Sequence, residues 1–243
     1  TMQVIDPEEE QKEKVKIKSF DGCGNQIRWW YQDAQKGINR INWTLEQKGV
    51  RYPSTPKPKE AKEPDGRKVV PGTYSVQIQY GENTVDETVV VVPDPNIPYS
   101  IVQMQEKAAA IDHFEKMVMD LTHEVDTLRA YRESVDLVNR RIKEMKETDG
   151  EAGREGIRTI IGKVGVPEEI QGIYRNPEIL MTDLRAMSRA LQDTWFPLTA
   201  AQEAQLKQIT LKIDATMEKI QQFKDTNWKN YRNAVLNNKV SIL

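Results

Sequence analysis

The sequence has 243 residues, of which 30% are charged and 38% hydrophobic, and its 35 basic and 37 acidic residues give a net charge of −2. Such a balance favours neither nucleic acid nor an anionic membrane as a partner, and no apolar run approaches the roughly 18 to 20 residues that span a bilayer. Cys23 is the single cysteine, which excludes an intrachain disulfide and a cysteine-based zinc site.

Residues 1–13 are mostly charged, with three glutamates at their centre, and are predicted to form a solvated leader or linker. Val4 and Ile5 leave open a short strand or a contact with a part that lies outside this sequence. No signal peptide is recognisable at the start. We therefore interpret Thr1 as the edge of a processed or excised fragment.

Residues 14–97 predict a small antiparallel β-sandwich. Polar and apolar residues alternate over residues 14–20, which is typical of a half-buried strand, and a turn with two glycines separates this strand from a return strand at 26–31. Short strands separated by turns favour a sandwich. The further predicted strands are 38–45, 73–80 and 84–92.

Two parts of this β region carry more specific expectations. The four valines at 89–92 are apolar on both faces, which predicts a central strand. Residues 46–69 contain four prolines, and proline lacks the N–H that a sheet ladder needs, so this segment is predicted to leave the core.

Residues 98–243 predict a three-helix bundle. A first long helix begins near Ile101 and ends at 148–150, and its apolar residues recur every three or four positions like the seam of a coiled coil. A glycine-rich irregular connector follows at 150–177, and a second helix starts at Pro177. Thr199 and Gln202 form a capping-box signature for the third helix. The seam is expected to pack inside the bundle, with self-association of the chain as the alternative.

No catalytic, cofactor-binding or metal-binding residue is predicted. His113 and His123 lie about 15 Å apart along one predicted helix, too far to hold one metal ion together. Cys23 has no histidine near it in the sequence, and its flanking glycines connect two strands, without the helix N-terminus that a phosphate loop requires. The carboxylates show no pair framed for glycoside hydrolysis.

Trp29, Trp30, Tyr31 and Trp43 could form a sugar-stacking platform, and the three tryptophans among them are the candidate binding residues. Aromatic side chains can stack on the apolar faces of sugars, and they also form cores and interdomain contacts. Because Trp29 and Trp30 are adjacent on a strand, their side chains must point to opposite faces of the sheet. At least one of them can therefore be exposed. Core or interdomain packing is the favoured role, and carbohydrate binding is the alternative.

The β region resembles a known domain. Residues 14–17 and 24–28 are similar to the opening strands of the Ig-like domain of the flagellar hook-capping protein. Residues 37–43 (Gly-Ile-Asn-Arg-Ile-Asn-Trp) and 71–74 (Pro-Gly-Thr-Tyr) match that domain's later pattern. Such a domain, ending in Asp-Pro and followed by helices, looks like the C-terminal region of exported bacterial proteins with sortilin-like, neuraminidase-type repeat β-propellers that are labelled glycosyl hydrolases.

This resemblance implies an Ig-like sandwich, export from the cell (to the periplasm, the cell surface or the medium) and a β-propeller that precedes this chain in the same polypeptide. It carries over no catalytic residue, because a site of that family would lie in the propeller. The leading hypothesis is a non-catalytic accessory fragment that docks on the propeller or another protein. A carbohydrate-binding module is the alternative, and a hydrolase site at the junction of the two domains is a third hypothesis.

Overall fold

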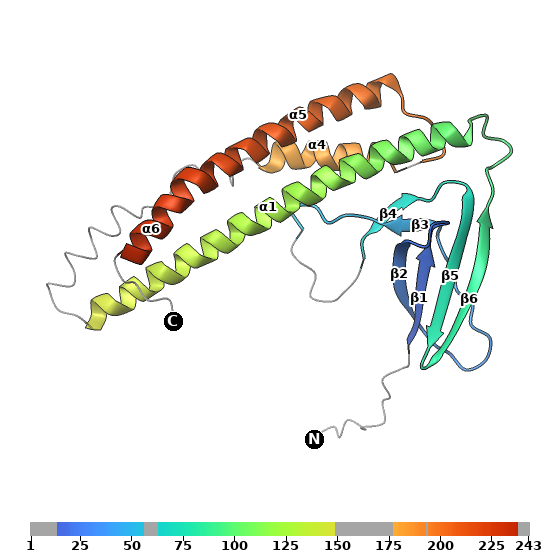
Figure 1. Cartoon of the computed structure of the whole chain (residues 1–243), viewed down its shortest axis with the longest axis horizontal. Helices are drawn as coiled ribbons and strands as arrows, with labels where there is room; N and C mark the ends of the chain where they lie inside the picture. The colour runs from blue at the N-terminus through green and yellow to red at the C-terminus, as the bar shows by residue number, and fades with distance from the viewer. Residues whose placement is uncertain (1–13, 56–62, 149–176, 193, 238–243) are drawn as a thin grey trace, which may run out of the picture. The chain divides into compact units, whose positions relative to one another are not determined.

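The computed structural model of the chain describes residues 14–55, 63–148, 177–192 and 194–237. It combines antiparallel β-sheets with long helices, as the sequence predicted (Figure 1). The predicted leader and nearly all of the predicted connector lie outside the described residues.

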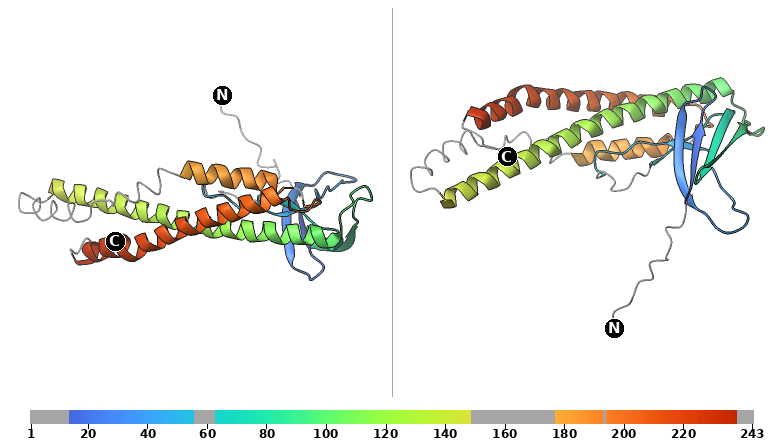
Figure 2. Two further views of the ribbon diagram at one scale, coloured as in Figure 1. Left: turned by 90° about the horizontal axis from the view of Figure 1, so that it is seen from above. Right: turned by 60° about the horizontal axis from the view of Figure 1, so that its bottom comes forward.

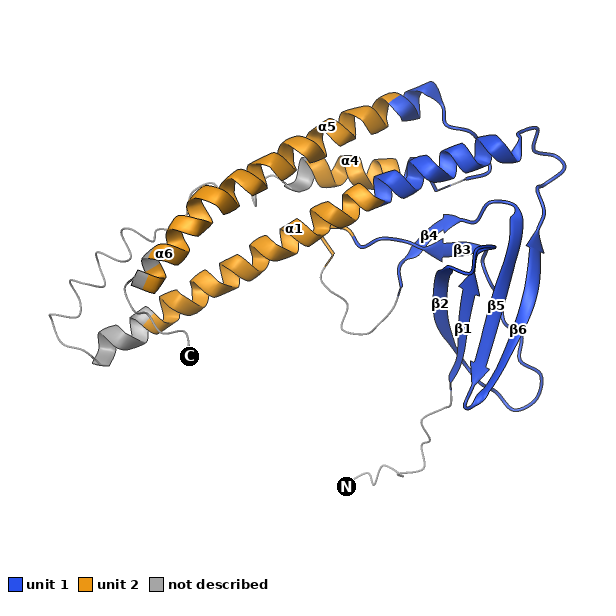
Figure 3. Ribbon diagram, viewed as in Figure 1, with its two compact units in different colours: residues 1–51, 56–115, 188–203 blue, residues 52–55, 116–187, 204–243 orange. Residues whose placement is uncertain are grey.

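The chain divides into two compact units (Figure 3). Unit 1 comprises residues 1–51, 56–115 and 188–203, and unit 2 comprises residues 52–55, 116–187 and 204–243. Unit 1 therefore joins all the strands to the first turns of a helix that the sequence assigned to the bundle.

The main sheet of unit 1 has four antiparallel strands in the order β2-β1-β5-β6. The strands are β1 (Lys14–Phe20), β2 (Gln26–Asp33), β5 (Gly72–Tyr80) and β6 (Asn83–Val91). The period of two in the sequence is matched in the structure, since every second side chain of β1 is buried and Tyr74 and Val76 of β5 are buried on the same face. A second sheet consists of two antiparallel strands, β3 (Glu46–Lys48) and β4 (Asp65–Lys68).

The core of unit 1 lies on one face of the main sheet. One buried cluster contains Val15, Ile17 and Val76, and a second contains Val69, Tyr74 and Val91. Trp43 and Val89 pack against both clusters. The side chains that continue the two clusters are Ile27, Trp30, Ala34, Ile41, Leu45 and Ile78.

Two strand predictions are wrong. Residues 38–45 form no strand, because they pair with no strand of either sheet. Leu45, at their end, takes the left-handed backbone conformation with φ 57° directly before β3 begins. The valines at 89–92 do not belong to a central strand, since β6 lies at the edge of the sheet and leaves Val90 63% exposed. The segment 46–69 lies outside the main sheet as predicted, but it contributes β3 and β4.

The predicted starts of the three helices agree with the structure. Helix α1 extends over Ile101–Thr148, α4 over Pro177–Ala190 and α5 over Ala200–Phe223. The predicted capping box of α5 is present, with Thr199 N–H donating to Gln202 Oε1 over 3.0 Å and Gln202 N–H donating to Thr199 Oγ1 over 3.2 Å. Each bond satisfies an N–H group that the helix itself leaves unpaired.

The helices of unit 2 bury the predicted apolar stripes. Within this unit α1 and α5 run in the same direction and α4 runs in the opposite one (Figures 1 and 2). The buried hydrophobic residues of the unit on these three helices are Val118, Leu121, Leu128, Val135, Val138, Met181, Leu184, Met187, Ile209, Ile213, Ile220 and Phe223. Lys224 pairs with Glu124, and Lys212 pairs with Asp183. None of the described helices is long and apolar enough to cross a membrane.

A π-helical turn carries the chain from α5 into the last helix. This turn, η1 (Lys224–Trp228), leads into α6 (Lys229–Asn237). Trp228 stacks on Tyr131 of α1 with ring centroids 3.9 Å apart and lies 5.2 Å from the ring of Tyr231. The wider turn thus places Trp228 between two aromatic rings, which fixes α6 against α1.

Candidate interaction surfaces of the β unit

The structure separates the three candidate tryptophans. Trp30 packs against the cluster of Val15, Ile17 and Val76 on the inner face of the sheet. Trp43 contacts both core clusters, meets Tyr74 edge-on at 5.6 Å, and donates its Nε1–H to the Glu46 carbonyl oxygen over 3.1 Å. Trp29 lies on the outer face, because it is paired with Lys18, whose side chain is opposite to the core residues of β1.

The outer face of the main sheet carries aromatic, amide and charged side chains in cross-strand rows. One row crosses all four strands and consists of Trp29, Lys18, Gln77 and Asp86. Lys18 Nζ donates to Gln77 Oε1 over 3.1 Å, and Gln77 Nε2 donates to Asp86 Oδ1 over 3.0 Å. Hydrogen bonding along the row orients the Gln77 amide, so this polar face has a defined arrangement.

Tyr31 completes the aromatic part of the outer face. Its ring is 51% exposed and meets Trp29 at 5.4 Å with an interplanar angle of 77°. Lys16 Nζ lies 5.7 Å from the Trp29 ring centroid and 5.9 Å from that of Tyr31. The two rings therefore form a corner with a cation beside it, and not a flat platform.

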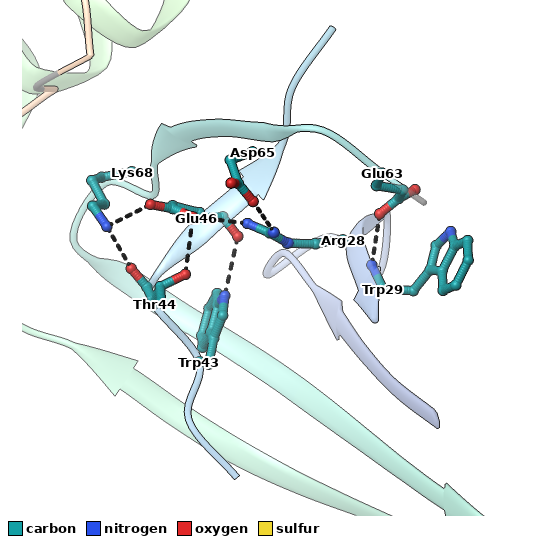
Figure 4. Close-up of polar contacts among 8 residues, drawn as sticks. All are labelled: Arg28, Trp29, Trp43, Thr44, Glu46, Glu63, Asp65 and Lys68. Atoms are coloured by element: carbon teal, nitrogen blue, oxygen red, sulfur yellow. Dashed lines mark hydrogen bonds and ion pairs between the residues drawn. The ribbon is translucent and has the colours of Figure 1, made fainter. Parts of the chain in front are cut away.

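A network of charged side chains joins β2 to β3 and β4 (Figure 4). Arg28 Nη1 contacts Glu46 Oε2 over 2.9 Å, and its Nη2 pairs with Asp65. Lys68 Nζ contacts Glu46 Oε1 over 2.8 Å and also donates to the Thr44 carbonyl oxygen. The four charges neutralise one another, which identifies this cluster as a structural link between the two sheets.

The pKa of Glu46 shows how this network is balanced. Burial acts to raise the pKa of the carboxyl, but hydrogen bonds from Lys68, Thr44 and Arg28 outweigh burial and lower the pKa below its ordinary value. Glu46 is therefore ionised at neutral pH and accepts bonds from three side chains.

Further polar contacts connect the β3–β4 ribbon to the helical part of unit 1. Arg67 holds Asp112 of α1 with two bonds, from Nε to Oδ1 over 2.8 Å and from Nη2 to Oδ2 over 2.9 Å. Thr194 is buried and donates its hydroxyl to the Lys68 carbonyl oxygen over 3.1 Å. A bidentate arginine–carboxylate pair fixes orientation as well as distance. The start of α1 and the segment before α5 are thereby tied to the ribbon.

The two edges of the main sheet differ. At the β2 edge the Trp29 backbone N–H, which points away from β1, donates to Glu63 Oε2 over 2.7 Å, and β3 lies beside the strand. At the β6 edge no further strand is paired in the described part of the chain. Residues 83–88 of β6 are all exposed. The sheet thus has one covered edge and one open edge.

The hairpin turn before β6 determines which of its backbone groups face the open edge. Gly81 has φ 58° and is the first of two loop residues, as a type II′ turn requires. Such a turn closes on a hydrogen-bonded pair, here Tyr80 and Asn83, and such pairs alternate along an antiparallel ladder. The groups directed outward therefore belong to the residues between these pairs, namely Thr84, Asp86, Thr88 and Val90.

The other residues weighed for chemistry lie apart from one another. His113 and His123 are exposed on α1, and the described residues contain no group of histidine, cysteine and carboxylate side chains that could hold a metal ion. Cys23 is exposed in the turn between β1 and β2. In that turn the Asp21 carboxylate accepts the backbone N–H groups of Cys23 and Asn25 over 2.9 and 2.8 Å, which gives Asp21 a structural role.

Sequence reasoning missed the Arg28 network and the open β6 edge. Tyr31 is grouped by the sequence with the three tryptophans as part of a possible sugar-stacking platform, and it lies two residues after Trp29, on the same face of the strand. No family model matches this chain, and no curated protein or solved structure is significantly similar to it.

Proposed function

We propose that the chain is a non-catalytic accessory module that docks on another protein domain through the β6 edge of its main sheet. In this proposal unit 1 is an Ig-like sandwich, and the helices of unit 2 form a three-helix bundle that serves as a rigid arm or second interface. The partner is the exported β-propeller that the resemblance places earlier in the same polypeptide.

The contrast between the two sheet edges carries the proposal. A strand edge with free N–H and C=O groups is a template for pairing with another chain, and proteins usually protect it. The β2 edge is protected by Glu63 and β3. The β6 edge is open and presents Val85 and Val90, which are 56% and 63% exposed. Exposed valines on an open edge favour contact with a partner.

Hydrogen exchange tests docking directly. The amides of Thr84 and Thr88 should exchange at least about ten times more slowly in a polypeptide that includes the preceding propeller than in residues 1–243 alone, because a partner covers them. The Trp29 amide, already bonded to Glu63, is the internal control and should exchange alike in both. Equal exchange rates at Thr84 and Thr88 in the two polypeptides would refute docking at this edge.

Carbohydrate binding at the outer face is the second candidate. It is favoured by Trp29 and Tyr31, which adjoin a hydrogen-bonded row of lysine, glutamine and aspartate side chains. Sugar sites combine an aromatic ring with a few oriented polar groups. Trp30 and Trp43 are core residues and would act by supporting the fold.

A glycan array probed with the chain tests this second candidate. Any glycan bound at this face should lose about five- to thirtyfold in affinity with Trp29→Ala or Tyr31→Ala, since stacking contributes on the order of 1 to 2 kcal/mol. Val85→Ala on β6 is the matched control. Silence of the array, or binding that survives both aromatic substitutions, would exclude the site.

A further inference from the structure

We infer that the β6 edge accepts an extended, lysine- or arginine-bearing segment of its partner as a fifth strand of the main sheet. This inference rests on the proposed docking function and adds to it the binding mode and the chemistry of the partner.

The backbone of β6 supplies the binding mode. Thr84, Asp86, Thr88 and Val90 direct their N–H and C=O groups away from β5, as the hairpin register requires. These four residues alternate with residues bonded to β5, so they present the spacing that an added strand needs. Main-chain hydrogen bonds to such an edge provide affinity, and side chains on the two faces provide specificity.

The charge of the edge identifies the partner. Glu82, Asp86 and Glu87 lie on or beside β6, and residues 81–100 include no lysine or arginine. The contact of Asp86 is with the neutral amide of Gln77, which leaves its negative charge in place. Opposite charges on directly facing residues stabilise a strand pair, and like charges destabilise it. The edge therefore favours a basic strand and disfavours an acidic one.

A second copy of this chain fits the edge poorly. Antiparallel pairing of two β6 strands over residues 83–91 places Glu87 of one copy directly opposite Glu87 of the other, which is destabilising. Val85 is exposed on the face of β6 opposite to Asp86, which indicates that the partner strand carries apolar residues on that face and basic ones on the other. The expected segment thus alternates basic and β-branched side chains.

A synthetic peptide provides the test. The probe is a heptapeptide of alternating β-branched and lysine residues with blocked ends, and its control has glutamate in place of lysine. Titration into ¹⁵N-labelled residues 1–243 should shift the amide signals of Thr84, Asp86 and Thr88. The lysine peptide should bind at least about tenfold more tightly than the glutamate peptide at low salt, and added salt should narrow the difference.

Two variants make the test specific. Thr88→Pro removes an outward N–H while leaving the ladder to β5 intact, so it should fold and lose at least about tenfold in affinity. The double variant Asp86→Lys with Glu87→Lys keeps every backbone group and should reverse the preference between the two peptides. If Thr88→Pro fails to fold, the double variant still tests the inference, because an unchanged preference for the lysine peptide would contradict it.

The outcomes separate this inference from the proposed function. Equal affinity for the two peptides, or signal shifts at Trp29 instead of β6, would overturn the basic-strand inference. If β6 were nevertheless protected from exchange beside the propeller, docking would stand and only the partner's chemistry would be wrong. A concentration-dependent dimer that protects β6 would overturn the inference in favour of a second copy.

Discussion

Leu45 has an unusual backbone for its residue type. Its φ of 57° lies in the left-handed region, which costs a residue with a Cβ atom about 1 to 2 kcal/mol. The conformation is held by its neighbours, since Val69 N–H donates to the Leu45 carbonyl oxygen over 2.8 Å and the Trp43 side chain bonds to the carbonyl of Glu46. The same turn directs Leu45 into the core cluster of Val69 and Tyr74.

Glycine should therefore be more stable than alanine at position 45. Leu45→Gly and Leu45→Ala both lose the leucine packing, but glycine removes the left-handed strain and should be more stable by about 1 kcal/mol in urea unfolding. Leu121, which is buried on α1, is the matched control. There the alanine variant should be more stable than the glycine variant by about 1 kcal/mol. If the alanine variant were the more stable one at both positions, left-handed strain at Leu45 would be contradicted.

Glu46 should make folding sensitive to acid. Its pKa is lowered in the folded state, so its stabilising effect is present above the unfolded value of about 4.5 and is lost as pH falls through the folded value. Glu46→Gln should cost about 1 to 2 kcal/mol at pH 7, because Lys68 and Arg28 lose a charged acceptor. The difference in the free energy of unfolding between wild type and variant, measured in urea, should be smaller at pH 3.5. A difference that is unchanged in acid would rule out this role.

At the scale of elements, the β3–β4 ribbon depends on two glycines at its crossing point. A Cβ atom on Gly66 would lie 2.6 Å from the Gln47 carbonyl oxygen, and one on Gly49 would lie 2.2 Å from that of Asp65. Real Cβ atoms do not approach backbone so closely. The ribbon that carries Glu46, Arg67 and Lys68 can therefore form because these two positions lack side chains.

Gly66→Ala should open the ribbon. We expect a loss of about 2 to 3 kcal/mol in thermal or urea unfolding, since the clash is with backbone and cannot be relieved by a side-chain rotation. The amide of Gly49, which donates to the Pro64 carbonyl oxygen over 2.9 Å, should also exchange faster. Gly72→Ala is the control, because its nearest neighbour would be an ordinary 3.8 Å away. If Gly66→Ala and Gly72→Ala lost equal stability, the backbone around Gly66 would not be too close for a Cβ atom.

Local patterns predicted most elements but not their neighbours. Alternation identified β1, β2 and β5, and the capping pair of Thr199 and Gln202 marked the start of α5. The run of valines was misread, because a strand's place in the sheet depends on pairing and not on its own composition. The left-handed conformation of Leu45, at the end of the strand predicted at 38–45, has no signature in its residue type.

The candidate surfaces, too, depend on contacts between distant parts of the chain that local patterns do not predict. The opposite orientation of Trp29 and Trp30 followed from the period of a strand, yet the sequence could not tell which of them faces solvent. Arg28 finds its acidic partners 18 and 37 residues further along the chain, at distances that no local period connects. The open edge of β6 became visible once the order of the strands was known.

At the scale of the whole molecule, Glu115 and Glu46 affect the free energy of unfolding in opposite pH ranges. Burial, together with the nearby Asp112 carboxylate, raises the pKa of Glu115 to about 7, while Arg67 acts to lower it. Arg67 compensates weakly because Asp112 already holds it by two bonds. The protein should therefore lose stability in strong acid through Glu46 and towards neutrality through Glu115.

The expected stability maximum lies near pH 4.5 to 5. The contribution of Glu115 is fully present below its unfolded value of about 4.5 and is lost as pH rises through 7, because the folded protein must then hold a buried charge. Allowing for partial contact with solvent, the loss should be on the order of 1 to 2 kcal/mol, or a few degrees in Tm. Glu115→Gln should remove the decline between pH 5 and 8 in thermal unfolding. Exposed Glu106→Gln on the same helix is the control and should leave the decline unchanged. A wild-type curve that is flat over this range, or one that Glu115→Gln leaves unaltered, would refute the buried acid as its cause.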